Sequence, residues 1–132
     1  SLTIDDGFSE IDFGRWSGRK LSSLRREPLW RDIQERPSIV TFPDGESFRG
    51  AQKRAYQSFN SLCEMRGDKT FLIVSHSDTI KLLLSKVLSQ KLDSFQSLQI
   101  DPASFSIVRS HKGNFTLTTM NNSGQLKDLL RQ

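Results

Sequence analysis

The sequence contains few of the residues that build cross-links and metal sites. Its 132 residues include one cysteine, Cys63, and two histidines, His76 and His111. A single cysteine forms no internal disulfide, which favours a reducing compartment, and we expect a cytoplasmic location. Two isolated histidines and one cysteine also lack the spacing of metal ligands. The sequence therefore predicts neither a metal ion nor another cofactor.

Long apolar segments are also missing, because no run approaches the roughly 20 apolar residues that span a bilayer. The chain begins at Ser1 without a methionine or a charged-then-apolar leader, so we expect that it begins inside a longer gene. Hydrophobic residues make up 35% and charged residues 26%, as in ordinary globular proteins. We therefore expect no membrane partner and a single domain over residues 1–132.

The charge is moderately basic, with a formal net charge of +4 and a pI near 9.5. Basic residues are concentrated between Arg15 and Arg31, but acidic residues are interspersed with them. No basic stripe with interleaved aromatic residues follows, so we expect a solvated surface rather than a nucleic-acid partner.

Apolar periodicity predicts several helices. Leu21–Arg26 forms a short one, and Pro28 is suited to the first position of another that continues to Glu35. From Ser47 as N-cap, apolar residues recur at three- and four-residue steps to about Met65. A second long helix starts near Ser77 or Asp78, one of which would be its cap, and continues to Leu88.

The remaining pattern is that of strands. Thr70–Ser75 is apolar without alternation, which predicts a strand buried on both faces in a parallel sheet. After a helical turn over Asp93–Ser97, Ser104–Arg109 and Phe115–Met120 predict two strands joined by a hairpin turn at 111–114. The polar end is predicted to be weakly helical. Helices alternating with strands indicate an α/β fold.

His76 has the most informative position, at the carboxyl end of the predicted strand and directly before a helix. Ligands of open α/β sheets bind at such positions. Free N–H groups and the partial positive charge of the helix N-terminus favour a phosphate group, which could also contact His76. The alternative is a structural hydrogen-bonding role, which is common for a histidine at a strand end.

Glu46 lies in a turn before the helix that Ser47 caps, and it also has two interpretations. As structure, an acid at a helix start complements the dipole by about 0.3–1 kcal/mol. As chemistry, a neighbouring phosphate dianion should raise the pKa of the carboxyl, as a general acid near neutral pH requires.

A third segment, 10–18, contains two glycines that allow the backbone to bend. We interpret Phe13 and Trp16 as scaffolding for this loop. Glu10 and Arg15 are the residues that could line the mouth of a substrate site.

Four segments, in this order and spacing, resemble the histidine phosphatase superfamily, nearest its broad-specificity and alpha-ribazole phosphatase branch. They are Glu10-Ile-Asp-Phe-Gly-Arg-Trp-Ser-Gly18, Pro43-Asp-Gly-Glu-Ser47 with Arg54, Val74-Ser-His76, and Ile100-Asp-Pro-Ala-Ser104. The resemblance covers nearly the whole chain. It implies a phosphoglycerate mutase-like, three-layer αβα domain with a mostly parallel open sheet, of which this chain is the C-terminal two-thirds and lacks the N-terminal strand.

The resemblance also implies an activity, the hydrolysis of phosphate esters of small metabolites through a phosphohistidine intermediate. In that family a histidine attacks phosphorus, a carboxyl protonates the departing oxygen, and two arginines and a second histidine hold the phosphate. Carried over, Glu46 is the proton donor, His76 is the second histidine, and the backbone N–H of Ser77 is a further phosphate contact. Asp78 departs from the family pattern and brings a negative charge near the phosphate.

The family's nucleophile lies in an Arg-His-Gly motif that is absent here, and His111 is expected in an exposed hairpin turn. We therefore expect little or no turnover from this chain alone, and self-association through the sheet edge that the absent strand leaves open. One alternative is a non-catalytic pseudo-phosphatase that binds an anionic ligand or a protein partner. Another is a basic nucleic-acid-binding domain, which predicts steeply salt-dependent affinity.

Overall fold

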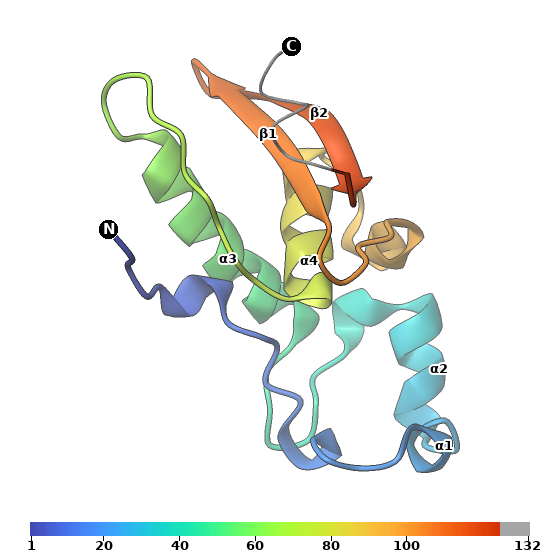
Figure 1. Cartoon of the computed structure of the whole chain (residues 1–132). Helices are drawn as coiled ribbons and strands as arrows, with labels where there is room; N and C mark the ends of the chain where they lie inside the picture. The colour runs from blue at the N-terminus through green and yellow to red at the C-terminus, as the bar shows by residue number, and fades with distance from the viewer. Residues whose placement is uncertain (125–132) are drawn as a thin grey trace.

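The computed structural model describes residues 1–124 and shows a mixed α/β fold (Figure 1). Its α-helices and strands are α1 (Leu21–Leu24), α2 (Pro28–Glu35), α3 (Phe48–Cys63), α4 (Ser77–Val87), β1 (Phe105–His111) and β2 (Asn114–Asn122). Short 3₁₀ helices are η1 (Asp6–Phe8), η2 (Gly14–Trp16), η3 (Pro37–Ile39) and η4 (Leu92–Ser97). The predicted weakly helical end lies at residues outside this described part.

The helix α3 begins where the sequence predicts. The Ser47 hydroxyl accepts a hydrogen bond from the Gly50 N–H at 3.0 Å, which satisfies one of the free donors of the first turn. The buried residues of α3 are Phe48, Ala51, Ala55 and Phe59, at the predicted three- and four-residue steps. The predicted helices over α1 and α2 are also confirmed, with Pro28 at the first turn of α2.

The helix α4 is almost completely apolar along Leu82–Leu84, as predicted, but its cap differs from the prediction. The N-cap position is His76, and its side chain makes no capping hydrogen bond. The Ser77 hydroxyl instead donates to the Ile100 carbonyl at 2.9 Å, and Asp78 lies 3.6 Å from the Lys81 ammonium. The prediction of a Ser77 or Asp78 cap is therefore wrong, because both side chains have partners elsewhere.

The predicted hairpin is confirmed and is longer than expected. β1 and β2 pair antiparallel, with His111 opposite Asn114. The turn consists of Lys112 and Gly113, which both have positive φ angles, of 49° and 77°. Such a two-residue turn matches the twist of the flanking strands. His111 is exposed, as the sequence predicts.

Residues 71–75 form no strand in the described structure, contrary to the prediction. Leu72 is 85% and Val74 is 79% exposed, whereas Ile73 packs against a core cluster. Within residues 1–124, no backbone hydrogen bond joins this segment to another one. The segment is extended and packed on one face only, because nothing in the described part pairs with it or covers its other face. The described sheet is accordingly two-stranded and antiparallel, and the predicted parallel sheet is not seen in it.

The core connects the helices to the hairpin in three clusters. The largest joins the opening loop and α2 to α3, α4 and η4, with Trp16, Ile33, Phe42, Phe48 and Phe95 among its members. A second places Ala55 and Phe59 of α3 against α4 and the hairpin residues Val108 and Phe115. A third packs Leu84, Leu98 and Ile100 against the hairpin. In Figure 1, α3 and α4 accordingly lie side by side next to the hairpin. No helix in residues 1–124 has the length and hydrophobicity of a membrane span.

Two loops interlock near the start of α3, and glycines make this approach possible. The Arg15 N–H donates to the Pro43 carbonyl at 2.8 Å, and the Glu46 N–H donates to the Asp12 carbonyl at 2.9 Å. A Cβ at Gly14, whose φ is 55°, would overlap the Pro43 carbonyl oxygen. A Cβ at Gly45 would overlap the Asp12 carbonyl oxygen. The contact therefore fixes Glu46 against the opening loop.

Replacement of Gly14 by alanine tests this interlock. Gly14→Ala should lose about 1–2 kcal/mol from the left-handed backbone and a further 1–3 kcal/mol or so from overlap with Pro43. Gly18→Ala is the matched control, because Gly18 also has a positive φ, of 76°, but a Cβ there meets no atom within 4 Å. Urea unfolding of both variants measures the difference. Equal losses would show that the two loops do not constrain each other.

Candidate active site

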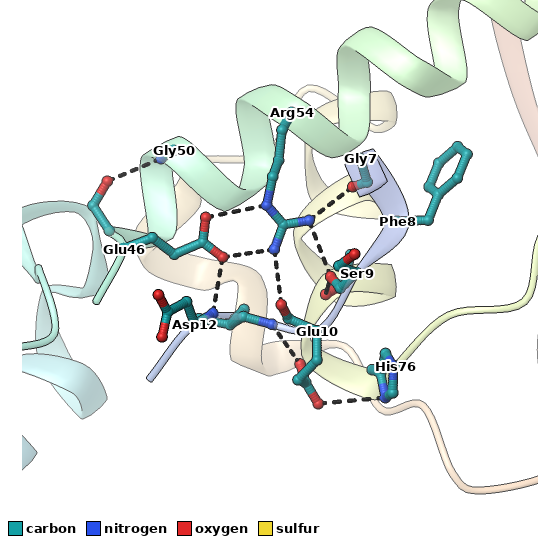
Figure 2. Close-up of polar contacts among 12 residues, drawn as sticks. Gly7, Phe8, Ser9, Glu10, Asp12, Glu46, Gly50, Arg54 and His76 are labelled. Atoms are coloured by element: carbon teal, nitrogen blue, oxygen red, sulfur yellow. Dashed lines mark hydrogen bonds and ion pairs between the residues drawn. The ribbon is translucent and has the colours of Figure 1, made fainter. Parts of the chain in front are cut away.

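The Arg54 side chain joins α3 to the opening loop (Figure 2). Its Nη1 donates to the carbonyl oxygens of Gly7 at 2.8 Å and Ser9 at 3.0 Å, and its Nη2 donates to that of Glu10 at 3.1 Å. Nε and Nη2 donate to the Glu46 carboxylate at 3.1 and 2.6 Å. These five hydrogen bonds equal the five N–H donors of a guanidinium group, so the side chain has one well-defined position.

The Glu46 carboxylate is held by Arg54 and by the opening loop. Its Oε1 accepts the Asp12 N–H at 3.0 Å, so Glu46 and Asp12 are bonded through both backbone and side chain. Burial raises the pKa of Glu46. The hydrogen bonds from Arg54 and Asp12 and the charge of Arg54 lower the pKa, and together they outweigh burial. The net pKa lies below the ordinary value, so at neutral pH Glu46 is an ionised partner of Arg54.

The opening loop has further anchors on both sides of its contact with Arg54. The Ser75 hydroxyl donates to the Phe8 carbonyl at 2.7 Å, and the buried Thr79 hydroxyl donates to the Ser9 carbonyl at 3.0 Å. The loop is thus bonded to α3, to the segment before α4, and to α4 itself. This fixes the backbone that carries Glu10.

The Glu10 carboxylate lies next to His76. Its Oε2 is 3.6 Å from His76 Nδ1, and its Oε1 accepts the Ile11 N–H at 2.9 Å. The His76 side chain is 55% exposed, so the imidazole is open to solvent. Ser77 follows as the first residue of α4, and its N–H is one of the free donors of the helix N-terminus.

Four of the five predicted site residues therefore lie close together around one short stretch of the opening loop. Glu46 is bonded to Asp12, and His76 lies against Glu10, two residues earlier, with Ser77 next in the chain. Because a residue spans at most about 3.6 Å of chain, these contacts lie close together. Glu46 and His76 are thirty positions apart in the sequence.

Arg15, the fifth predicted residue, has different partners. It forms an exposed ion pair with Asp44 at 3.2 Å. It also lines a surface hollow of about 250 Å³ together with Trp16, Arg19, Glu27 and Pro43. None of Glu10, Glu46 and His76 lines this hollow.

The scaffolding role that the sequence predicts for Phe13 and Trp16 is confirmed. Both rings pack edge-on against Phe42, with centroid separations of 5.1 and 5.5 Å. Sequence reasoning assigned no role to the side chain of Arg54 or to Asp12. The available signal was an acid just before the predicted helix, Glu46, and a base about two turns into it, Arg54. Within residues 1–124, no three histidine, cysteine or acidic side chains are grouped as a metal site needs.

Removal of the guanidinium should change the ionisation of Glu46. The pKa of Glu46 is lower in the folded chain than its ordinary value of 4.5, so the ionised carboxylate stabilises the fold at any pH above 4.5. This stabilisation is lost as the pH falls through the lowered pKa of the folded state. In Arg54→Met the pKa should rise, because burial then acts without the arginine. The folded state should also lose about 1.5–3 kcal/mol at neutral pH.

The measurement is an NMR titration of Glu46 together with urea unfolding from about pH 3 to 7. Arg49→Met is the control, because Arg49 is an exposed arginine of the same helix that donates to Ser38 and not to Glu46. An unchanged Glu46 titration in Arg54→Met would contradict the assigned role of this pair.

Comparison with known proteins identifies the family of the chain. The profile of the histidine phosphatase superfamily, branch 1, matches residues 1–123. The bifunctional protein Rv2228c of Mycobacterium tuberculosis is 29% identical over 127 residues, which cover 95% of this chain and 35% of that protein. Phosphoserine phosphatase 1 of Hydrogenobacter thermophilus is 26% identical over 120 residues, covering 89% of this chain and 56% of that protein.

A solved structure shows the same fold. The alpha-ribazole phosphatase from Shigella flexneri superposes with a TM-score of 0.78 at 22% identity, covering 93% of this chain and 62% of that chain. The chain thus spans between about a third and two-thirds of the length of the proteins that it matches. The resemblance identified from four sequence segments is confirmed, and this chain belongs to the histidine phosphatase superfamily, branch 1.

Proposed function

We propose that this chain is part of a phosphoric monoester hydrolase that acts on a small phosphorylated metabolite through a phosphohistidine intermediate. The observation that carries the proposal is that Glu46 accepts the Asp12 N–H while His76 lies beside the Glu10 carboxylate, two residues earlier in the same loop. Membership of the superfamily, and the similarity to a protein named as a phosphoserine phosphatase, support the same reaction class.

In this proposal His76 and the Ser77 N–H bind the phosphate group. The exposed imidazole presents a donor to solvent, and the start of α4 adds a free N–H and a partial positive charge. Glu10 lies beside His76 and can orient the ring. Glu10 and Arg15 line the mouth through which the substrate enters, with Arg15 at its outer part beside Asp44.

Glu46 is the proton donor of the proposed reaction. Arg54 holds its carboxylate in place and lowers its pKa, whereas a nearby phosphate dianion acts in the opposite direction. The bound substrate would thus convert an ionised, oriented carboxylate into a general acid. The proton then passes to the departing ester oxygen as the bond to phosphorus breaks.

The nucleophile is proposed to come from outside these 132 residues. The sequence has no Arg-His-Gly motif, and its other histidine, His111, is exposed at the tip of the hairpin. We propose that a strand bearing this motif pairs with residues 71–75 and completes a single three-layer αβα domain with a mostly parallel sheet. The backbone of residues 71–75 has the open hydrogen-bonding groups that such pairing needs. The proposed location is the cytoplasm.

Aryl phosphate hydrolysis tests the proposal. The 132-residue chain should show little or no turnover, whereas a longer reading frame that adds an upstream Arg-His-Gly strand should be active. In that longer protein Glu46→Gln should lower kcat by about 10²–10⁴, because general acid catalysis is lost. Glu35→Gln is the control, because Glu35 is an exposed acid whose ion pair in the described part is with Arg31 of the same helix.

Two results would overturn the proposal. Turnover by the short chain that depends on Glu46 would show that no further nucleophile is needed. Phosphate binding that depends on His76, without turnover in the longer protein, would favour a pseudo-phosphatase that binds an anionic ligand.

The exposed residues Leu72 and Val74 are proposed to mediate self-association of the short chain through the open edge. Leu72→Lys/Val74→Lys should therefore shift the chain toward the monomer in sedimentation experiments. Leu2→Lys/Ile4→Lys is the matched control, because those residues are 94% and 89% exposed and lie at the N-terminus. If both double variants shift the monomer fraction equally, residues 71–75 have no special role in self-association.

A further inference from the structure

A groove lies between α3 and α4, and its lining shares no residue with the candidate active site. It has a volume of about 430 Å³ and is lined by Arg49, Gln52, Lys53, Tyr56, Gln57 and Lys86. The first five belong to α3, and Lys86 comes from the last turn of α4. Its volume is in the range of small-molecule sites, about 300–1,000 Å³.

The groove is basic and contains no carboxylate among its lining residues. Arg49, Lys53 and Lys86 each bring a positive charge, and none of them forms an ion pair within residues 1–124. Six other cations of the described part are paired with acids, namely Arg15, Arg19, Arg31, Arg36, Arg54 and Lys81. Others, such as Lys20 and Lys91, form no ion pair there either. What distinguishes the groove is that cations from two helices line the same hollow.

One acid, Asp93, interacts with a cation of the groove. Asp93 carries a lowered pKa, first because of hydrogen bonds from Ser38 and only then because of the charges of Arg49 and Arg36. Its Oδ1 accepts the Ser38 N–H at 2.8 Å, and the Arg49 Nε donates to the Ser38 carbonyl at 3.2 Å. Asp93 and Arg49 therefore meet around Ser38, whereas Lys53 and Lys86 form no ion pair with any residue of 1–124.

The positions of the groove residues are fixed by contacts between the helices. The Gln52 Nε2 donates to the Leu82 carbonyl at 2.9 Å and so joins α3 to α4. The Lys86 ammonium lies over the Tyr56 ring, 5.7 Å from its centroid. Arg49 and Lys53 are four residues apart and occupy the same face of α3, where like charges repel each other. An anion in the groove would remove this repulsion.

We propose that this groove binds a small molecule with two or more phosphoryl groups. Three cations from two helices match a polyvalent anion better than a single phosphate, and the planar guanidinium of Arg49 suits phosphate oxygens. The limited volume of this open groove favours a small molecule over a macromolecule. The groove shares no residue with Glu10, Glu46 or His76, so this site is independent of the proposed hydrolysis.

The test uses inorganic tripolyphosphate as the probe, with the 132-residue chain at physiological salt. Calorimetry should detect binding, and NMR shifts should be centred on Lys53, Tyr56 and Lys86. Lys53→Gln/Lys86→Gln should weaken binding about tenfold, from the loss of two ion pairs. Lys20→Gln/Lys91→Gln is the matched control, since it removes the same net charge at exposed sites outside the groove and should change affinity less than about twofold.

Further arms separate this site from the candidate active site and from other ligands. In His76→Asn, tripolyphosphate should still shift the NMR signals of Lys53, Tyr56 and Lys86 at the same concentrations, and inorganic phosphate should bind the groove at least about tenfold more weakly than tripolyphosphate. Equal affinity of the groove for citrate would overturn the assignment to phosphoryl groups. Absence of binding, equal loss in both lysine pairs, or loss of these groove shifts in His76→Asn would overturn the groove as the site.

Discussion

The guanidinium group of Arg54 is the interaction on which the arrangement of the candidate site depends. Three carbonyl oxygens of the opening loop and one carboxylate accept its hydrogen bonds, and these acceptors are separated from it by eight to 47 positions in the sequence. Because three consecutive or near-consecutive carbonyls of the loop must all reach the same guanidinium, few backbone conformations of the loop satisfy them. The side chain therefore determines where Glu10 and Asp12 lie relative to α3.

Other contacts extend this constraint to both ends of the site. At one end, close backbone approaches at Gly14 and Gly45 bring the turn before α3 against the loop. At the other, Ser75 and Thr79 bind the loop from the segment before α4 and from α4 itself. The helices α3 and α4 hold the opening loop in place, and the loop in turn contacts Glu46 and His76, which precede these two helices. Such division between a rigid scaffold and a loop is common in functional sites.

The features that the sequence predicted are those that depend on local interactions. Apolar periodicity and the Ser47 cap predicted α3, and the Lys-Gly turn between two β-rich runs predicted the hairpin. The four sequence segments led to the superfamily and to Glu46 and His76. The organising role of Arg54 was not predicted because three of its acceptors are main-chain carbonyls 44 to 47 positions away, and a carbonyl carries no residue-type signal.

The two errors have the same cause. The cap of α4 was misassigned because the Ser77 hydroxyl has a partner at Ile100, which no local pattern indicates. Residues 71–75 have the composition of a buried strand, and that composition predicts burial only when a neighbouring strand and a covering layer exist. In the described part both are absent, so one face is packed and the other is exposed.

The extended segment before His76 has one more consequence. Its amide groups have no backbone acceptor in the described structure, although Ile73 and Ser75 hold it in place. Hydrogen–deuterium exchange follows the opening of hydrogen bonds rather than position alone, so these amides should exchange as fast as those of a peptide. Slow exchange would arise only once another strand docks beside them, which makes this stretch a built-in reporter of assembly.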